Sequence, residues 1–190
     1  IEYPYRIRMG HLKDFPSEHR AEMFDKDTLL EAAYNRAISR GFEGVMIKDL
    51  NASYSVGKRS VSLLKHKPPR IELDVVITSA KYGEGKRADV FGSYGISVRS
   101  DEGFQQIGSV GTGFSEGDLI MLTTELKKIV DLYEKDTFYV LPRIVLEVTG
   151  DLISQDSEGN WALRFPRVKR IRRDKYAVDC NTIQDVIEMA

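Results

Sequence analysis

Two lysines, Lys65 and Lys67, stand two residues apart, the spacing that places both side chains on one face of a β-strand. Ammonium groups side by side repel each other, so the pair is unfavourable unless an anion lies between them. A phosphate group is the natural anion for such a pair. The alternative is a pair of solvated lysines at a strand end, which is common in proteins.

Positive charge is also concentrated near the end of the chain. Residues 164–175 read RFPRVKRIRRDK, so seven of these twelve positions are Lys or Arg and one is Asp. Basic and apolar residues alternate, and a strand would display Arg170 and Arg172 on one face with Lys175 just beyond it. Such a face suits a polyanion, either a nucleoside triphosphate or a nucleic-acid backbone. A solvated basic edge strand that blocks unwanted strand pairing is the alternative.

Glu43 stands in a predicted strand, residues 42–48, whose centre is apolar. A carboxylate in that place offers hard oxygen ligands to a divalent cation. By position alone, a glutamate that faces water at the start of the strand is the commoner case.

The composition is that of a globular protein without a membrane span. Hydrophobic residues make up 42% and charged residues 30% of the chain, and no apolar run approaches the ~20 residues that cross a bilayer. The single cysteine, Cys180, excludes an internal disulfide and a cysteine-based zinc site. Because the net charge is only −1, nucleic-acid binding would depend on local basic segments.

A helix is predicted before the first of these sites. Apolar residues recur at helical spacing from Leu29 to Ile38, and Thr28 with Glu31 forms a capping-box pattern. Gly41 is placed to end this helix.

Short strands are predicted at 6–9, 42–48 and 63–67. Pro68 and Pro69 then interrupt the pattern, because proline restricts the preceding residue and cannot donate to a ladder. We expect a domain boundary at 68–72, which gives domains of residues 1–70 and 71–190.

The second domain has the pattern of an OB-fold, a small, partly open barrel that often binds nucleic acid. Five strands are predicted with one helix, 116–134, between the third and fourth, and a closing helix at 182–189. Trp161 and Phe165 are expected in its core. The predicted strands lie at 72–81, 90–99, 104–109, 143–149 and 161–171.

Read in order, three segments resemble motifs IV, V and VI of the ATP-dependent DNA ligases, which are covalent nucleotidyltransferases. They are GFEGVMIK at 41–48, YSVGKRS and LLKHKP within 54–68, and the basic run at 164–175. The resemblance implies an α+β chain. It would hold the C-terminal subdomain of a nucleotidyltransferase (ATP-grasp-like) domain, followed by a five-stranded OB-fold β-barrel with one inserted helix.

The resemblance implies a nucleotide site around the first two motifs. In ligases the motif V lysines contact the α-phosphate of ATP and then of the bound AMP, roles that would fall to Lys65 and Lys67. Arg59 matches an arginine that helps to hold the nucleotide. Glu43 matches the motif IV glutamate, which contacts the catalytic metal, here Mg²⁺.

Motif VI of ligases orients the β- and γ-phosphates of ATP during self-adenylation, which implies this role for Arg170, Arg172 and Lys175. Positive charge there stabilises the departing pyrophosphate. The basic residues that could reach a DNA backbone are Lys58, Lys86, Arg87, Arg164 and Arg167.

The nucleophilic lysine of ligases lies in a K-x-D-G motif, and no K-x-D-G occurs in these 190 residues. We therefore expect a fragment that lacks the upstream remainder of the nucleotidyltransferase domain and cannot adenylate itself alone. The family's reaction moves AMP from ATP to the lysine, then to the 5′-phosphate of a nick in duplex DNA, until the 3′-hydroxyl displaces it. The OB domain turns between these steps, and residues 68–72 would be the hinge.

Two alternatives remain open from the sequence. One is an RNA ligase or a capping-type guanylyltransferase, which shares motifs IV and V in looser form. The other is a non-catalytic OB module that binds nucleic acid. A ligase would act in the cytoplasm at the nucleoid of a prokaryote or archaeon, or in a eukaryotic nucleus, and the sequence names no processivity partner.

Overall fold

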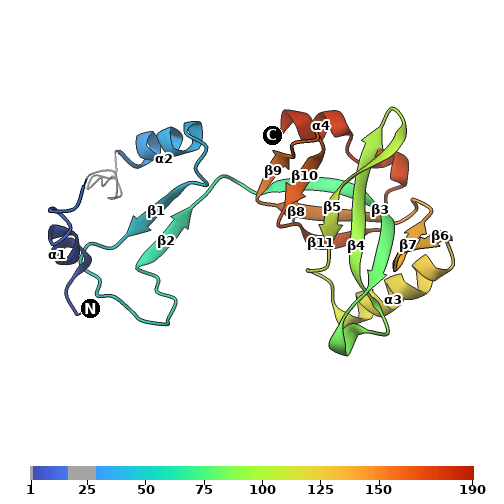
Figure 1. Cartoon of the computed structure of the whole chain (residues 1–190), viewed down its shortest axis with the longest axis horizontal. Helices are drawn as coiled ribbons and strands as arrows, with labels where there is room; N and C mark the ends of the chain where they lie inside the picture. The colour runs from blue at the N-terminus through green and yellow to red at the C-terminus, as the bar shows by residue number, and fades with distance from the viewer. Residues whose placement is uncertain (1, 17–28) are drawn as a thin grey trace. The chain divides into compact units, whose positions relative to one another are not determined.

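The computed structural model describes residues 2–16 and 29–190. The chain divides into two compact units, Ile1–Pro68 and Pro69–Ala190, which we call the hairpin unit and the sheet unit (Figure 1). No helix among the described residues is long and apolar enough to cross a membrane.

The hairpin unit consists of two helices and one antiparallel β-hairpin. In the hairpin, Val45 lies opposite His66 and Lys48 lies opposite Leu63. His66 faces α2, where its ring centroid is 4.4 Å from that of Tyr34. The elements are α1 (Tyr5–Gly10), α2 (Leu30–Ser39), β1 (Val45–Lys48) and β2 (Leu63–His66).

Helix α1 stands where the sequence predicted a short strand at 6–9, so that prediction was wrong. Pro4 occupies the N-cap position, and its fixed φ suits a helix start. The N–H groups of Tyr5 and Arg6 have no partner inside the helix, and they donate to the carbonyls of Ala52 and Leu50 at 2.9 and 3.0 Å. Four residues of alternating character were too few to distinguish a strand from a helix end.

Helix α2 ends as predicted. Gly41 has a φ of +77°, and its N–H donates to the carbonyl of Ile38 at 2.9 Å. This left-handed conformation is open to glycine at little cost, and it satisfies one of the last carbonyls of the helix. Leu29 occupies the N-cap position, and the predicted cap, Thr28, lies outside the described residues.

The sheet unit is built on one curled antiparallel sheet (Figure 1). Its strands lie in the order β11-β8-β3-β4-β5, and a β6–β7 hairpin joins β3. Helix α3 comes between β5 and β8 in the chain, the position predicted for the inserted OB-fold helix. The elements are β3 (Ile71–Tyr82), η3 (Gly85–Arg87), β4 (Phe91–Ser100), β5 (Gly103–Val110), α3 (Glu116–Lys127), β6 (Val130–Glu134), β7 (Thr137–Val140), β8 (Val145–Gly150), β9 (Leu152–Gln155), β10 (Trp161–Arg164), β11 (Arg167–Arg172), η4 (Ala177–Asp179) and α4 (Ile183–Glu188).

The sheet and α3 enclose a continuous apolar core. Ile77, Ile96 and Leu146 come from three adjacent strands, and Leu122 comes from the helix; all four are fully buried. Burying one such side chain stabilises the fold by about 1.5–3 kcal/mol relative to leaving it exposed. Strands β3, β4 and β8 are therefore firmly placed, and so are the residues that they present on the opposite face.

Helix α3 is shorter than the predicted helix at 116–134. Ser115 and Asp118 form a capping box at its start, and the helix ends at Lys127. Residues 130–134 instead form β6, which turns back into β7 through Lys135 and Asp136, both at positive φ. This pair of left-handed residues is typical of a tight two-residue hairpin turn.

The strand predicted at 161–171 is two strands, β10 and β11, separated by Phe165 and Pro166. Phe165 has a φ of +54° and is 74% exposed, so the prediction that it lies in the core was wrong. Trp161 is half-buried and packs against the core as predicted. Pro166 lacks a backbone N–H, which suits it to a break between strands.

Residues after β11 cover part of the outer face of β3 and β8. Cys180 packs with Val76 and Val145 in a second, smaller apolar cluster, where burial raises the pKa of its thiol to about 12. Asn181 binds the backbone of Asp74 twice, accepting from its N–H at 2.8 Å and donating to its carbonyl at 3.0 Å. The backbone of β3 is thereby fixed at Asp74.

Candidate functional site

The hairpin unit brings together three of the predicted residues, Glu43, Lys65 and Lys67, which we call the hairpin site. A carboxylate oxygen of Glu43 lies 3.1 Å from the ammonium nitrogen of Lys67. Glu43 was predicted inside a strand at 42–48, but β1 begins only at Val45, so the glutamate lies in the segment before the strand. The anion beside Lys67 in this structure is therefore the carboxylate of Glu43.

Gly44 makes this close approach possible. Its φ is +133°, and a β-carbon built on it would overlap the carbonyl oxygen of His66. Only a glycine lets the chain before β1 pass so near the end of β2. The register of the hairpin and this glycine together place Glu43 next to Lys67.

Lys65 extends from the face of the hairpin opposite to α2. It pairs with Met46 across the hairpin, and successive residues of a strand point to opposite sides, so it points away from the side of His66. Lys65 is exposed, and the side chain of Lys67, just past the strand, is 36% exposed. Both lysines are accessible to a ligand of the size of a phosphate group.

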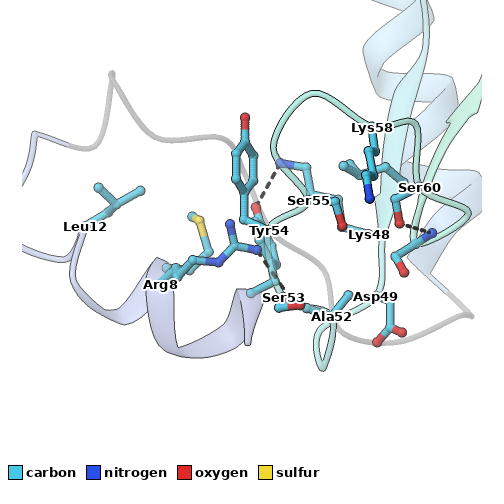
Figure 2. Close-up of a pocket in the computed structure, with 14 residues that line it drawn as sticks. Arg8, Leu12, Lys48, Asp49, Ala52, Ser53, Tyr54, Ser55, Lys58 and Ser60 are labelled. Atoms are coloured by element: carbon cyan, nitrogen blue, oxygen red, sulfur yellow. Dashed lines mark hydrogen bonds between the residues drawn. The ribbon is translucent and has the colours of Figure 1, made fainter. Parts of the chain in front are cut away.

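The hairpin unit also holds a cavity of about 440 Å³ between α1 and the loop after β1 (Figure 2). The guanidinium of Arg8 lies 5.4 Å from the ring centroids of both Tyr5 and Tyr54. Lys48 donates to the hydroxyl of Tyr5 at 3.1 Å, and Lys58 also lines the cavity. Neither Arg8 nor Tyr5 was predicted as a site residue, because their place in helix α1 was not predicted from the sequence.

Arg59 is exposed in the loop between the strands and does not line this cavity. Within the described residues, no group of three His, Cys, Asp or Glu side chains could hold a metal ion by itself. Glu43, with 68% of its side chain exposed, offers one carboxylate. A single carboxylate can suit Mg²⁺, which usually keeps several waters and takes further ligands from substrate phosphates.

The sheet unit places the other predicted cluster on the outer face of β3, β8 and β11. Arg170 lies opposite Glu147, and Glu147 lies opposite Asp74 on the next strand. Four cations and four carboxylates meet there, and we call them the outer-face network. Its members are Glu72, Asp74, Glu147, Lys169, Arg170, Arg172, Asp174 and Lys175.

Arg172 is the most enclosed cation of the network, with 13% of its side chain exposed. Its Nη1 donates to Asp74 at 3.0 Å and lies 3.4 Å from Glu147, while Nε and Nη2 donate to Asp174 at 2.9 and 2.7 Å. Lys175 donates to Asp74 at 2.6 Å. Arg170 donates through Nε to Glu147 at 2.7 Å, yet 61% of its side chain stays exposed.

The network holds two of its carboxylates, Glu147 and Asp174, in the charged form. The pKa of Glu147 is lowered to about 2, first because Lys169 donates to it and then because Arg170 does. The pKa of Asp174 is lowered well below its usual range by the hydrogen bonds from Arg172. The pKa of Lys169 is raised, chiefly by Glu147 and then by Glu72.

The acidic half of the network was not predicted from the sequence. Asp74 and Glu147 each stand in a strand whose neighbouring residues are apolar, and that contrast was the available signal. An isolated charge at the centre of an apolar strand is rare unless it is paired. The predicted polyanion-binding face is thus electrically balanced within the protein.

The remaining predicted cations lie in separate elements of the sheet unit. Lys86 and Arg87 are exposed in η3, and Arg167 is exposed at the start of β11. Arg164 donates from Nε to the hydroxyl of Ser154 at 2.7 Å, which fixes it against β9.

Two protein-family models match the chain. The model of the ATP dependent DNA ligase domain matches residues 9–67, and that of the ATP dependent DNA ligase C terminal region matches residues 87–175. Curated relatives include the DNA ligase of Methanospirillum hungatei, 41% identical over 99% of this chain, and that of Methanocaldococcus jannaschii, 47% identical over 80%. The chain spans 35% and 27% of the length of these two relatives.

Solved structures show the same fold. The ligase domain of M. tuberculosis LigD superposes with a TM-score of 0.53 at 28% identity, covering 77% of this chain and 50% of that one. A Lig E DNA ligase gives a TM-score of 0.61 over 90% of this chain and 60% of that one, and at 19% identity this likeness concerns the fold alone.

Proposed function

This chain belongs to the ATP-dependent DNA ligase family, and on that premise we propose that the protein it is part of seals nicks in duplex DNA. The reaction would consume ATP and pass through an enzyme-adenylate and a DNA-adenylate. The nucleophilic lysine would come from the upstream remainder of the nucleotidyltransferase domain, because no K-x-D-G occurs in these residues. By itself the chain would not take up AMP.

The observation that carries the proposal is the hairpin site. The carboxylate of Glu43 and the ammonium group of Lys67 meet at 3.1 Å, and a second exposed lysine, Lys65 of β2, lies two residues before Lys67. Lys65 and Lys67 would hold the α-phosphate of ATP and then that of AMP, and Arg59 would contact the nucleotide. When the phosphate is bound, it would replace Glu43 as the partner of Lys67.

Mg²⁺ is the metal that this chemistry implies. Glu43, once released from Lys67, would offer it one oxygen ligand, with the remaining ligands being phosphate oxygens and waters. Bound there, the ion would neutralise charge on the phosphates.

The sheet unit would supply the cations for the leaving pyrophosphate. Of the three predicted phosphate-binding cations of this unit, Arg170 and Lys175 are more exposed than Arg172, and both would face the β- and γ-phosphates. Arg172, enclosed by three carboxylates, would contribute mainly by holding this strand in place. The residues left to contact the DNA backbone are Lys58, Lys86, Arg87, Arg164 and Arg167.

The test uses the full-length protein with Glu43→Gln and Lys67→Met made singly. We expect each to lower self-adenylation with ATP by about 10²-fold, the scale of losing one preorganised electrostatic contact. Glu31→Gln and Lys13→Met are matched controls, because both residues are exposed in the hairpin unit outside the site. Full self-adenylation by the Glu43 and Lys67 variants would contradict a catalytic role of the hairpin site and favour a non-catalytic module. In a sealing assay with the unaltered full-length protein, a preference for nicked RNA over nicked DNA would indicate an RNA ligase.

A further inference from the structure

Glu147 occupies an unusual place for a carboxylate. It lies in the middle of β8, between β11 and β3, and 11% of its side chain is exposed. Its neighbours Leu146 and Val148 point into the core, so Glu147 lies on the outer face. A carboxylate so enclosed is tolerated when cations surround it, and Lys169, Arg170 and Arg172 all lie within 3.4 Å of its oxygens.

An irregularity in β11 brings two consecutive cations to this one carboxylate. Val168 pairs with Val148 and Arg170 pairs with Glu147, so Lys169 is an extra residue without a partner of its own on β8. Lys169 reaches Oε1 of Glu147 at 2.9 Å, and Arg170 reaches Oε2 at 2.7 Å. A bulge of this kind re-aims side chains relative to a regular strand.

The two arginines of β11 are held in different ways. Arg172 uses all three of its nitrogen atoms on Asp74, Glu147 and Asp174. Arg170 is held through Nε, and within the described part of the chain its two terminal nitrogens have no protein partner. A guanidinium anchored by Nε still presents its terminal N–H groups, the pair that binds a phosphate in bidentate fashion.

We propose that Glu147 is a positioning residue for self-adenylation, which aims the free end of Arg170 at the polyphosphate of ATP. It restricts an exposed side chain before the ligand arrives, so that less conformational freedom is lost on binding. This inference rests on the proposed ligase function. In this inference Arg170 contacts the phosphates, whereas Arg172 supports the strand. The sequence motif and the spacing of its residues do not distinguish these two roles.

The test compares Glu147→Gln with Glu72→Gln in the full-length protein. Glu72 is the matched control, because it belongs to the same network but pairs only with Lys169 among the described residues. Self-adenylation is measured against ATP concentration, and sealing is measured separately on a nick that already carries AMP. We expect Glu147→Gln to lower kcat/KM for ATP by about tenfold, a barrier change of about 1.4 kcal/mol, with sealing of the adenylated nick within about twofold. Glu72→Gln should leave both steps within about twofold.

Arg170→Lys provides a second measurement, in which the carboxylate of Glu147 itself is kept. Lysine keeps the charge but loses the Nε anchor and the flat terminal pair, so the same adenylation-specific loss is expected. Adding Glu147→Gln to Arg170→Ala should cause no further loss, because Glu147 acts through Arg170.

Three results would overturn the inference: equal losses in both steps, equal behaviour of the two glutamate variants, or full adenylation by Arg170→Lys. If the unaltered full-length protein neither adenylates nor seals, the proposed function fails instead, and the two failures are thereby distinguished.

Discussion

The two units hold their charged groups by different means. In the sheet unit, a core cluster of 21 buried residues supports the strands from which the outer-face network extends. In the hairpin unit, Ala33 is the only buried side chain among the described residues, and the hairpin site depends on strand register and on Gly44. The contrast shows that a site can be built either on a packed core or on local backbone geometry.

The exposure of the ion pairs follows this difference. Glu43 and Lys67 have side chains 68% and 36% exposed, whereas those of Glu147 and Arg172 are 11% and 13% exposed. An exposed pair is weakly held and screened by salt, so a ligand can separate it easily. An enclosed pair is costly to separate and therefore suits a structural role.

The largest expected effect comes from separating the units. We expect the fragment 69–190 to unfold cooperatively on heating, because it contains the whole core cluster. The fragment 1–68 should show no cooperative transition, since Ala33 alone is buried among its described residues. Circular dichroism and differential scanning calorimetry of both fragments test this. A sharp thermal unfolding transition in the fragment 1–68 would show that the hairpin unit also depends on a packed core.

Substitution of a glycine in each unit should separate catalysis from stability. Gly44 and Gly113 both have positive φ, and a β-carbon on either would overlap a backbone carbonyl oxygen, of His66 and Val168 respectively. We expect Gly113→Ala to destabilise the sheet unit by about 2 kcal/mol or more, through strain and displacement of β11. Gly44→Ala should leave the melting temperature of the sheet unit unchanged but lower self-adenylation of the full-length protein at least tenfold.

Gly41→Ala is the control for the backbone conformation alone. Gly41 has a φ of +77° but open space around it, so only the conformational cost of about 1 kcal/mol applies. If Gly41→Ala impaired adenylation as much as Gly44→Ala, the approach of Glu43 to Lys67 would not be the reason for the loss.

Acid should weaken the outer-face network in a defined range. The pKa of Glu147 is about 2 in the folded protein against the usual 4.5, because Lys169 and Arg170 donate to it. The charged carboxylate of Glu147 therefore contributes its full stabilisation of the folded state above pH 4.5. This contribution is lost as the pH falls towards 2, where the carboxylate is protonated in the folded state as well. The difference in melting temperature between the fragment 69–190 and its Glu147→Gln variant should therefore be constant near neutrality and shrink below pH 4.5.

If the difference in melting temperature between the fragment and its Glu147→Gln variant grew in acid, Glu147 would not stabilise the fold as a charged carboxylate. Lys128→Gln is a suitable control, since this exposed residue lies at the end of α3 outside the network.

The sequence predicted β3, β4, β5 and β8 close to their observed bounds, because clear turns separate these strands. It predicted neither β7 nor β9. Prediction from the sequence failed where a short segment fits two structures equally well, such as a helix and a strand. Residues 130–134 continue the apolar spacing of α3, and only the turn at Lys135 and Asp136 makes them a strand. Phe165 has a core-like side chain, but its position beside Pro166 turns it outward.

The candidate site shows a similar division. The cations were visible in the sequence because they form dense runs. Their partners Asp74 and Glu147 come from strands distant in the sequence, and only the register of β3, β8 and β11 brings them to Arg172. Pairing across strands is a property of the folded sheet, and a run of charges contains no information about it.

The smallest expected effect concerns the connection between the units. Pro68 and Pro69 remove two backbone donors and restrict the residue before each of them, which stiffens the segment predicted as a hinge. Replacing both with glycine should leave the melting temperature of the sheet unit within a few degrees and change the rate of nick sealing a few-fold. Pro142→Gly, a proline within the sheet unit, controls for loss of proline in general. Equal sealing rates for the unaltered protein, the Pro68 and Pro69 double variant and Pro142→Gly would count against a hinge at 68–72. The two units would then differ in stability but not in relative movement during the reaction.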